Sequence, residues 1–299
     1  DSFGGVIGNP FTYFAFNHVG SEPNPAFSST IPFLLFALFQ LKFAIITPAL
    51  ITGSFAGRVR FRSYIFFIVL FSIFIYCPLA HMTWHPDGLF RNWGVLDFAG
   101  GTVVHMSAGF AALAGAVFLG SRELIVQHTA NVPYVILGTG LLGFGWFGFN
   151  AGSALGANST AVIAFANTNI ASATAMITWI FYERMLGRKM SAVGACIGAV
   201  VGLVAITPAA GFVNIGQSMF IGFIASIISN WAINLKNKSG IDDTLDVFPT
   251  HGIGGIVGML LTAVFASGVG LVYGETSTFL YHLIVLLILT VLSFECSSA

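Results

Sequence analysis

The sequence predicts an all-helical integral membrane protein, a polytopic bundle whose helices cross a bilayer several times. Apolar residues make up 56% of the 299 residues and charged residues only 7%, whereas ordinary soluble domains contain about 25% charged residues. The mean hydropathy is +0.89. The apolar residues also gather into runs long enough to cross a bilayer as helices, which takes on the order of 20 residues each.

Residues 1–30 differ from the rest, because they are rich in Gly, Pro, Asn, Ser and Phe and contain no Lys or Arg. We expect them to form an ordered or partly ordered segment outside the membrane, and residues 31–299 to form the transmembrane domain. Nine apolar runs follow. They lie at about 31–55, 64–80, 97–120, 132–152, 160–182, 190–208, 217–235, 247–267 and 277–298.

The connections between the runs predict the orientation, because cytoplasmic connections collect Lys and Arg. One alternating set of connections carries nine basic residues, and the other set carries only Arg91. We therefore expect a cell-membrane protein with its N-terminal segment outside and its C-terminus in the cytoplasm. The nine are Arg58, Arg60, Arg62, Arg122, Arg184, Arg188, Lys189, Lys236 and Lys238.

The charge balance excludes another class of partner. The chain has 11 basic and 11 acidic residues, so it lacks the basic surface that binds nucleic acid. Cys77, Cys196 and Cys296 lie within apolar runs without the spacing of metal ligands. We expect them to be small buried hydrophobic residues and not a disulfide framework.

Two stretches, one in each half of the chain, place a histidine eight residues after an aspartate: Asp97 with His105, and Asp243 with His251. This pairing predicts inverted internal repeats related by a pseudo-twofold axis, with a site where the halves meet. At about 1.5 Å per residue, each histidine lies on the order of 12 Å from its own membrane face. In a hydrocarbon core about 30 Å thick, both approach the midplane and could touch.

A functional pair is favoured over two unrelated core histidines bonded to backbone carbonyls, because ionisable residues inside a membrane are costly. Two neutral imidazoles can share a hydrogen bond and pass a proton, since each ring has one donor and one acceptor nitrogen. Asp97 has two roles that can coexist. It can cap the following helix, and its negative charge can attract cations to an entrance.

Other polar residues have simpler explanations. Of the acidic residues before the eighth run, Asp242 is expected to be a solvated loop residue. His81 and His85 have the spacing of zinc ligands on a helix, yet Pro86 follows at once and no third ligand is evident, so we expect no metal site. No arrangement typical of an enzyme stands out.

Glycines recur every four residues in the sixth run and predict close helix packing; they are Gly194, Gly198 and Gly202.

Three stretches carry a resemblance to a known family. They read DFAGGTVVH at 97–105, followed closely by Ala108 and Gly109, then GWFGFNAGS at 145–153 and DVFPTHGIGGIVG at 246–258. These stretches resemble signature blocks of the Amt/Mep/Rh ammonium transporter family. The resemblance implies ammonium and ammonia as substrates, a homotrimer in the lipid bilayer, no cofactor, and a cytoplasmic regulatory or signalling module as a further partner.

The resemblance also assigns roles to single residues. It implies an outer ammonium site formed by Trp84, Phe39, Phe43, Ser153 and Asp97, and a gate formed by Phe43 and Phe149. It also implies that His105 and His251 form the pore and proton relay, and that Trp146 and Asn150 flank the pore. Three aromatic faces and one hydroxyl suit a small cation, since a cation–π contact contributes about 0.5 to 2 kcal/mol. The Trp and Ser positions resemble the Amt/Mep branch rather than the Rh branch.

Two features depart from the family pattern. The family has eleven spans, so nine runs imply that the opening pair is missing, and we expect this chain to be a fragment. Lys42 stands beside Phe43 near the middle of the first run, where the family usually has a small residue. If Lys42 faced the pore it would repel ammonium, whereas a position toward another helix or a subunit contact is favoured.

The expected function is ammonium transport. Ammonium would bind outside, lose a proton, and cross as ammonia past the two histidines. The alternative is an ammonium-sensing membrane domain of a signalling protein, which would share the fold and the site.

Overall fold

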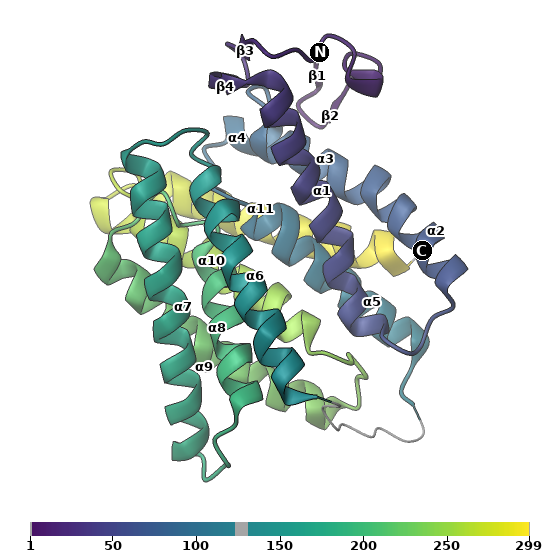
Figure 1. Cartoon of the computed structure of the whole chain (residues 1–299), viewed down its shortest axis with the longest axis vertical. Coiled ribbons are helices and arrows are strands. Elements are labelled where there is room, and N and C mark those ends of the chain that lie inside the picture. The colour runs from purple at the N-terminus through teal and green to yellow at the C-terminus, as the bar shows by residue number, and fades with distance from the viewer. Residues whose placement is uncertain (1, 123–130, 299) are drawn as a thin grey trace.

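The computed structural model describes residues 2–122 and 131–298 as a bundle of long helices with small hairpins at one end (Figure 1). The helices of the first half are α1 (Phe33–Phe55), α2 (Phe61–Phe71), the π-helical turn η2 (Ser72–Tyr76), α3 (Cys77–Trp84), α4 (Leu89–Asn92), the π-helical turn η3 (Gly101–Met106) and α5 (Ser107–Leu119). The second half contains α6 (Val132–Gly152), α7 (Ser159–Met185), α8 (Ala192–Ile206), α9 (Ile215–Ser239), the π-helical turn η4 (Phe248–Ile253), α10 (Gly254–Phe265), the 3-10 turn η5 (Leu271–Tyr273) and α11 (Thr276–Ser298).

The N-terminal segment is ordered and lies against the top of the bundle in Figure 1. Strands β1 (Ser2–Phe3) and β2 (Ile7–Gly8) pair antiparallel, as do β3 (Pro23–Asn24) and β4 (Ser28–Pro32), with the 3-10 turn η1 (Phe14–Phe16) between the two hairpins. The prediction that this segment does not span the membrane agrees with these short strands.

Eight helical stretches within the described residues are long and apolar enough to cross a membrane, and α8 is a shorter apolar helix of 15 residues. The predicted runs correspond to these nine elements, although several boundaries differ. The second run extends beyond residues 64–80 at both ends, because α2, η2 and α3 are consecutive. The helix of the third run begins at Gly101 and not at Asp97.

Capping side chains explain where several helices begin. The side chains of Asn131, Asn158 and Ser191 each accept a backbone N–H from the first turn of the helix that follows. At α9, Asn214 and Gln217 form a reciprocal capping box. Such caps satisfy backbone donors that have no partner within the helix.

Helices α7, α8 and α9 pack side by side (Figure 1), and small residues allow the close approach. A Cβ added at Gly198 would lie 2.6 Å from the Cβ of Trp179 and 3.0 Å from the carbonyl oxygen of Ala175. A Cβ at Gly202 would meet the carbonyl oxygen of Ala171. The predicted packing role of the glycine stripe is therefore confirmed.

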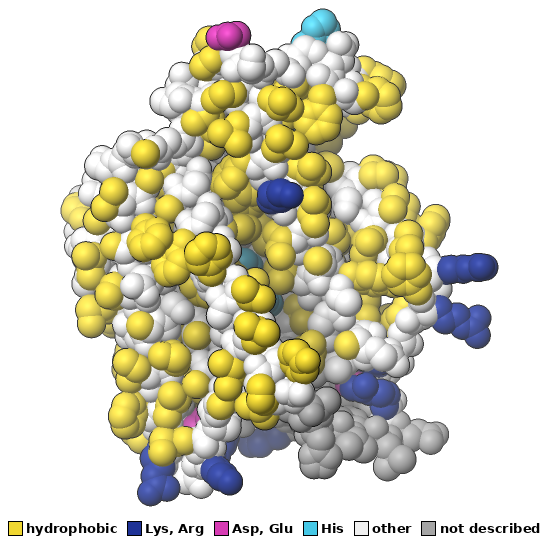
Figure 2. All heavy atoms as spheres, viewed as in Figure 1, with side chains coloured by type: hydrophobic (Ala, Val, Ile, Leu, Met, Phe, Trp, Pro, Cys, Tyr) yellow, Lys and Arg dark blue, Asp and Glu magenta, His cyan; other side chains and the backbone are white. Residues whose placement is uncertain are grey.

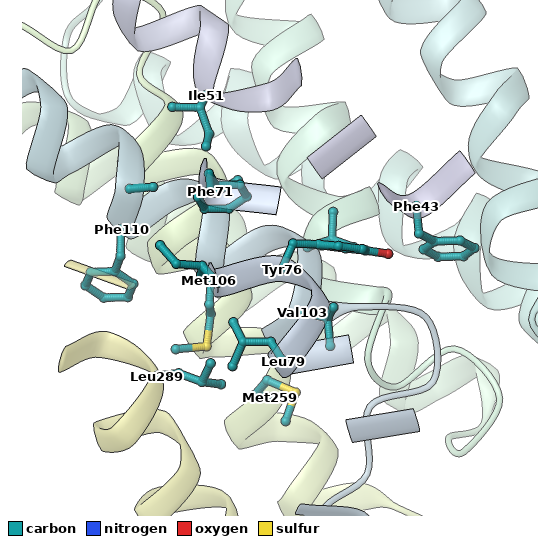
Figure 3. Packing of buried hydrophobic residues seen from close by; sticks show 14 of the residues in the cluster. Phe43, Ile51, Phe71, Tyr76, Leu79, Val103, Met106, Phe110, Met259 and Leu289 are labelled. Atoms are coloured by element: carbon teal, nitrogen blue, oxygen red, sulfur yellow. The ribbon is translucent and has the colours of Figure 1, made fainter. Parts of the chain in front are cut away.

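The largest apolar cluster joins α1, the α2–α3 stretch, η3, α5, α10 and α11. Figure 3 shows Met106, Leu79, Met259 and Leu289 together in its interior, with Phe43 at its edge. This cluster fixes α1 and η3 relative to one another. Phe43 is therefore held in place by the core.

The outer surface of the bundle is apolar over most of the face in Figure 2, and basic side chains gather near its lower and right edges. Such a surface suits lipid. Cys77 and Cys296 are exposed and Cys196 is half-buried, so the prediction that the cysteines are buried is wrong. The reason is that apolar residues face lipid as readily as the core, so an apolar run does not tell which face is inside.

Asp242 also differs from its prediction as a solvated residue. It is 4% exposed, and Arg122 donates to both of its oxygens, at 2.6 Å from Nε and 2.7 Å from Nη2. These hydrogen bonds lower the pKa of Asp242. Arg58 donates to the Asp242 backbone oxygen and to that of Gly120. Asp242 thus joins three connections at one end of the bundle.

Candidate functional site

The outer part of the site is a cavity of about 480 Å³ beneath the N-terminal hairpins. All five residues predicted for an outer site line it: Phe39, Phe43, Trp84, Asp97 and Ser153. α1 provides the two Phe residues, α3 ends at Trp84, and Ser153 follows α6. The structure therefore brings together residues from four separate segments of the chain.

Hydrogen bonds fix the orientation of the polar groups in this cavity. The indole Nε1 of Trp84 donates to the backbone oxygen of Asp97, at 3.0 Å, so the ring is held by its edge. The Ser153 hydroxyl donates to the backbone oxygen of Phe149, at 2.9 Å. Because that proton is used within the chain, the Ser153 oxygen can act as an acceptor toward a cation.

Below the cavity, two phenylalanine rings lie one against the other. The ring centroids of Phe43 and Phe149 are 4.3 Å apart, at an interplanar angle of 34°. Phe43 also contacts Trp84 edge to face, with centroids 5.4 Å apart. The gating role predicted for these two rings stays a prediction.

His105 and His251 lie directly beyond the phenylalanines. Their Nδ1 atoms are 3.3 Å apart, and the rings are 1% and 7% exposed. The centroid of His105 is 6.2 Å from that of Phe149 and 5.2 Å from that of Trp146, with the two His105–Trp146 rings stacked. The predicted contact between the two histidines is confirmed. The Nε2 atom of His105 is buried and has no hydrogen-bond partner among the described residues.

Each histidine lies in a π-helical turn that opens directly into an α-helix: His105 in η3 before α5, and His251 in η4 before α10. Single π turns within helices occur frequently at functional sites. The matching turns support the internal repeat that the aspartate–histidine spacing predicted. Each turn also widens the helix where its histidine leaves the backbone.

Asp97 holds the first of these turns. Its Oδ1 accepts the amides of Gly100 and Gly101, both at 2.7 Å, and its Oδ2 accepts the amide of Thr102 at 2.8 Å and the hydroxyl of the same residue. The predicted capping role is thus confirmed. Both oxygens are occupied by these bonds, so Asp97 has no free acceptor for a cation in the cavity, and its predicted part in binding stays a prediction.

Asp243 holds the second turn less completely. Its Oδ2 accepts the amide of Phe248, at 2.8 Å, whereas its buried Oδ1 has no hydrogen-bond partner among the described residues. Burial raises the pKa of Asp243. Asp246 instead pairs with Lys236, whose Nζ lies 2.6 Å from its Oδ1.

Trp146 stacks on His105, Asn150 directly follows Phe149 in the chain, and both are buried on α6; their role at the flanks of a pore stays a prediction. The Trp146 indole donates to the Thr207 hydroxyl at 2.9 Å, and the Asn150 amide donates to the Thr168 hydroxyl at 2.9 Å. These bonds tie α6 to α8 and α7. The position of α6 beside the site is thereby fixed by hydrogen bonds to its two neighbouring helices.

Sequence reasoning missed the glycines that let the two halves touch. A Cβ added at Gly109 would meet the backbone N and Cα of Gly252, the residue after His251. A Cβ at Gly255 would lie 3.0 Å from the backbone oxygen of Gly101. Gly109 and Gly255 each follow their histidine by four residues, so the repeat spacing was the signal that could have found them.

A second missed feature is the cation at the outer cavity. Arg91, which lines the cavity, donates from Nη1 to the backbone oxygen of Trp84, at 2.9 Å. It was visible in the sequence as the one basic residue in the outer connections. Of the two histidines with the spacing of zinc ligands, His81 bonds Ser2 through Nε2 at 2.8 Å and stacks on His85, which ties the first hairpin to α3.

Lys42 lies on the exposed side of α1, whereas its neighbour Phe43 is buried. Lys42 is the only Lys or Arg in that helix. No carboxylate within residues 2–122 and 131–298 forms an ion pair with it. The structure thus supports the outward position and not the pore-facing one.

We therefore expect Lys42→Ser to leave the ammonium current unchanged, because the side chain points away from the cavity and the phenylalanines. Solid-supported membrane recordings on proteoliposomes holding equal amounts of protein give the comparison. A current that rises in the serine variant would show that Lys42 obstructs conduction.

Comparison with known proteins supports the family resemblance that the three sequence stretches indicated. The family model described as Ammonium Transporter Family matches residues 1–299. An ammonium transporter from Aquifex aeolicus (strain VF5) is 51% identical over 282 residues, which cover 92% of this chain and 66% of that protein. This chain therefore spans about two thirds of the length of that relative.

Solved structures agree with these sequence relatives. The crystal structure of Saccharomyces cerevisiae Mep2 is similar with a TM-score of 0.91 and 34% identity, covering 99% of this chain and 71% of that one. A structure described as Sensor Amt Protein has a TM-score of 0.88 and 28% identity, covering 100% of this chain and 76% of that one.

Proposed function

This chain belongs to the ammonium transporter family, and from that premise we propose that it conducts ammonium-derived ammonia and a proton across the membrane through a twin-histidine pore. The observation that carries the proposal is the continuous sequence of groups from the outer cavity, past the Phe43–Phe149 pair, to the 3.3 Å contact between His105 and His251. Each part suits one step of the transport of a protonated base.

Ammonium binds first in the outer cavity. Trp84, Phe39 and Phe43 present aromatic surfaces to the cation, and the Ser153 oxygen accepts a hydrogen bond from one of its N–H groups. The carboxylate of Asp97 adds negative potential nearby, whereas Arg91 adds positive potential. These groups together replace part of the water around the ion.

Trp84→Leu is expected to raise the ammonium concentration that gives half-maximal current by about 2- to 30-fold, the equivalent of a cation–π contact worth about 0.5 to 2 kcal/mol. The maximal current should fall less, because leucine leaves the path below open. Concentration series on proteoliposomes give both values. An unchanged half-saturation in the leucine variant would exclude Trp84 as a recruiting residue.

Deprotonation follows at the phenylalanine pair, and the proton passes to Nε2 of His105, a buried imidazole nitrogen with no hydrogen-bond partner among the described residues. Two aromatic rings in close contact offer a cation little replacement for its hydration, while a neutral ammonia molecule passes at a smaller cost. Potassium has no proton to lose, so it stops above the rings. Selectivity therefore rests on chemistry and not on the diameter of the pore.

The histidine pair then conducts. Since each neutral ring has one donor and one acceptor nitrogen, the shared Nδ1–Nδ1 hydrogen bond lets a proton move along the imidazoles while ammonia passes beside them. Trp146 and Asn150 flank the same part of the pore and hold its second wall. The transport is charge-moving, because the proton and the ammonia both reach the inner side.

The assembly and the location follow from the same premise. The protein works as a homotrimer in the cell membrane, each subunit with its own pore, with residues 1–30 outside and the C-terminus in the cytoplasm. The basic residues of the alternate connections support this orientation. A cytoplasmic regulatory or signalling partner would then meet the inner connections, where Arg58 and Arg122 hold Asp242.

A current that ammonium evokes and potassium does not, in proteoliposomes containing the purified protein, is the result that this proposal requires. Matched liposomes without protein control for passive ammonia leak. Equal responses to ammonium and potassium in the protein-containing liposomes would refute selective ammonium conduction.

A second candidate function is ammonium sensing, which the similarity to the Sensor Amt Protein favours. A sensor needs the outer binding site but not conduction. Calorimetric binding of ammonium measured beside the current separates the two functions. Saturable binding without current would support the sensor, and binding accompanied by current would support the transporter.

A further inference from the structure

A third buried histidine lies outside the pore. His282 on α11 is 0% exposed. Its Nδ1 lies 2.7 Å from the backbone oxygen of Thr278, one turn earlier. Because a carbonyl oxygen only accepts, the Nδ1 atom carries the proton of the neutral ring. Nε2 lies 3.2 Å from the backbone nitrogen of Leu96 and 3.1 Å from its backbone oxygen. With the ring proton on Nδ1, Nε2 accepts the Leu96 N–H, and the Leu96 oxygen is a close contact that receives no hydrogen bond from the ring.

The backbone at Leu96 and Asp97 is where the outer cavity and the pore meet. Both residues line the cavity. The backbone oxygen of Asp97 accepts the indole N–H of Trp84, while its carboxylate accepts the amides that open η3, including those of Gly100 and Thr102. The Leu96–Asp97 backbone is thus bonded both to Trp84, the residue proposed to recruit ammonium, and to the turn η3 that contains His105.

α11 contacts this connection at a second point. The ring of Tyr281, the residue before His282, stacks on Trp93 with centroids 5.9 Å apart. That contact is aromatic and orients no backbone group. The imidazole of His282 is the contact from α11 that holds the Leu96 amide. It therefore also restricts the position of the neighbouring Asp97 carbonyl, which accepts the indole N–H of Trp84.

We propose that His282 is a positioning residue for ammonium recruitment, acting through the Leu96–Asp97 backbone on Trp84. This role rests on the proposed ammonium transport. Without the imidazole, the Leu96 amide loses its buried acceptor and the Asp97 carbonyl is free to move. Trp84 then loses the hydrogen bond that sets its ring toward the cavity.

The transport experiment compares His282→Leu, His282→Gln and the control Ser293→Ala. Glutamine can replace the ring, because its side-chain oxygen accepts the Leu96 N–H while its amide donates to Thr278. Ser293 is also buried on α11, and its hydroxyl has no hydrogen-bond partner among the described residues, so alanine there changes a polar group of the same helix without touching the connection.

We expect His282→Leu to raise the half-saturating ammonium concentration by about 2- to 30-fold, the range for loss of one cation–π contact, with a smaller change in maximal current. The glutamine and Ser293→Ala proteins should match the wild type. A leucine variant that loses maximal current at unchanged half-saturation would overturn the proposal. If leucine prevents assembly, the glutamine variant decides, and a raised half-saturation there would also overturn it.

Amide hydrogen exchange tests the anchor without relying on transport. The peptide containing Leu96 should exchange faster in His282→Leu than in the wild type, and at the wild-type rate in His282→Gln and Ser293→Ala. If the peptide containing Leu96 exchanges in the leucine variant at the wild-type rate, His282 does not hold this connection. A wild type that carries no ammonium current refutes the proposed transport alone, because the exchange result still decides whether the anchor exists.

Discussion

Potassium should pass through the protein when either pore histidine is replaced by aspartate. His105 and His251 are buried and share one hydrogen bond between neutral rings, so neither offers a charge to a bare cation. A carboxylate at either position is an acceptor that replaces the hydration of potassium. We expect His105→Asp and His251→Asp to carry a potassium current at least about tenfold above wild type, because about 1.4 kcal/mol of added cation stabilisation already gives that factor.

Solid-supported membrane recordings with potassium and with ammonium measure this change. His18→Asp is the matched control, since it makes the same substitution at an exposed residue of the N-terminal segment. The control should stay impermeable to potassium. If both pore variants exclude potassium and keep the wild-type ammonium current, the histidine pair is a structural hydrogen bond and the mechanism proposed here is wrong.

Gly109→Ala is expected to abolish most of the ammonium current. Its Cβ would meet the backbone of Gly252, and backbone atoms cannot rotate aside as a side chain can. Relief requires α5 and η4 to separate beside His251, which lengthens the hydrogen bond to His105. Overpacking of this kind costs about 1 to 3 kcal/mol, so the protein should still fold while its proton path is interrupted.

Gly140→Ala on α6 provides the control, because a Cβ there would have no atom within 4 Å. Size-exclusion profiles and thermal unfolding establish that both variants fold, and ammonium currents then compare them. A Gly109→Ala protein with the wild-type current would show that the close crossing at the histidines is not needed for conduction.

The common depth of the two histidines in the membrane was predictable because it depends only on quantities that a sequence contains. The Asp97–His105 and Asp243–His251 spacings are equal, the rise of a helix is fixed, and the distribution of Lys and Arg gives the direction of each span. No three-dimensional information beyond the thickness of a bilayer was required. The aromatic residues of the outer cavity were different, since only family resemblance singled out Phe43 and Phe149 among 31 Phe residues.

The faces of the helices could not be predicted in the same way. In a soluble helix the polar side marks the surface, but here both lipid and core accept apolar residues, so the periodic signal is lost. The exposure of Cys77 therefore became evident only in the structure, whereas a position of Lys42 away from the pore was already favoured from the sequence.

Partners distant in the chain were equally hidden from the sequence. Arg122 and Asp242 are 120 residues apart, and Leu96 and His282 are 186 apart. No local sequence pattern predicts either contact. Both depend on how the helices pack, which composition and spacing do not specify.

The central claim is that ammonium is split into ammonia and a proton that both cross. Simultaneous recording of current and of isotope-labelled nitrogen uptake in the same wild-type proteoliposomes tests it most directly. We predict that charge and nitrogen enter mole for mole with ammonium, and that potassium moves no charge. Nitrogen uptake without charge would contradict the separate proton path, and an equal current with potassium would contradict the need for deprotonation.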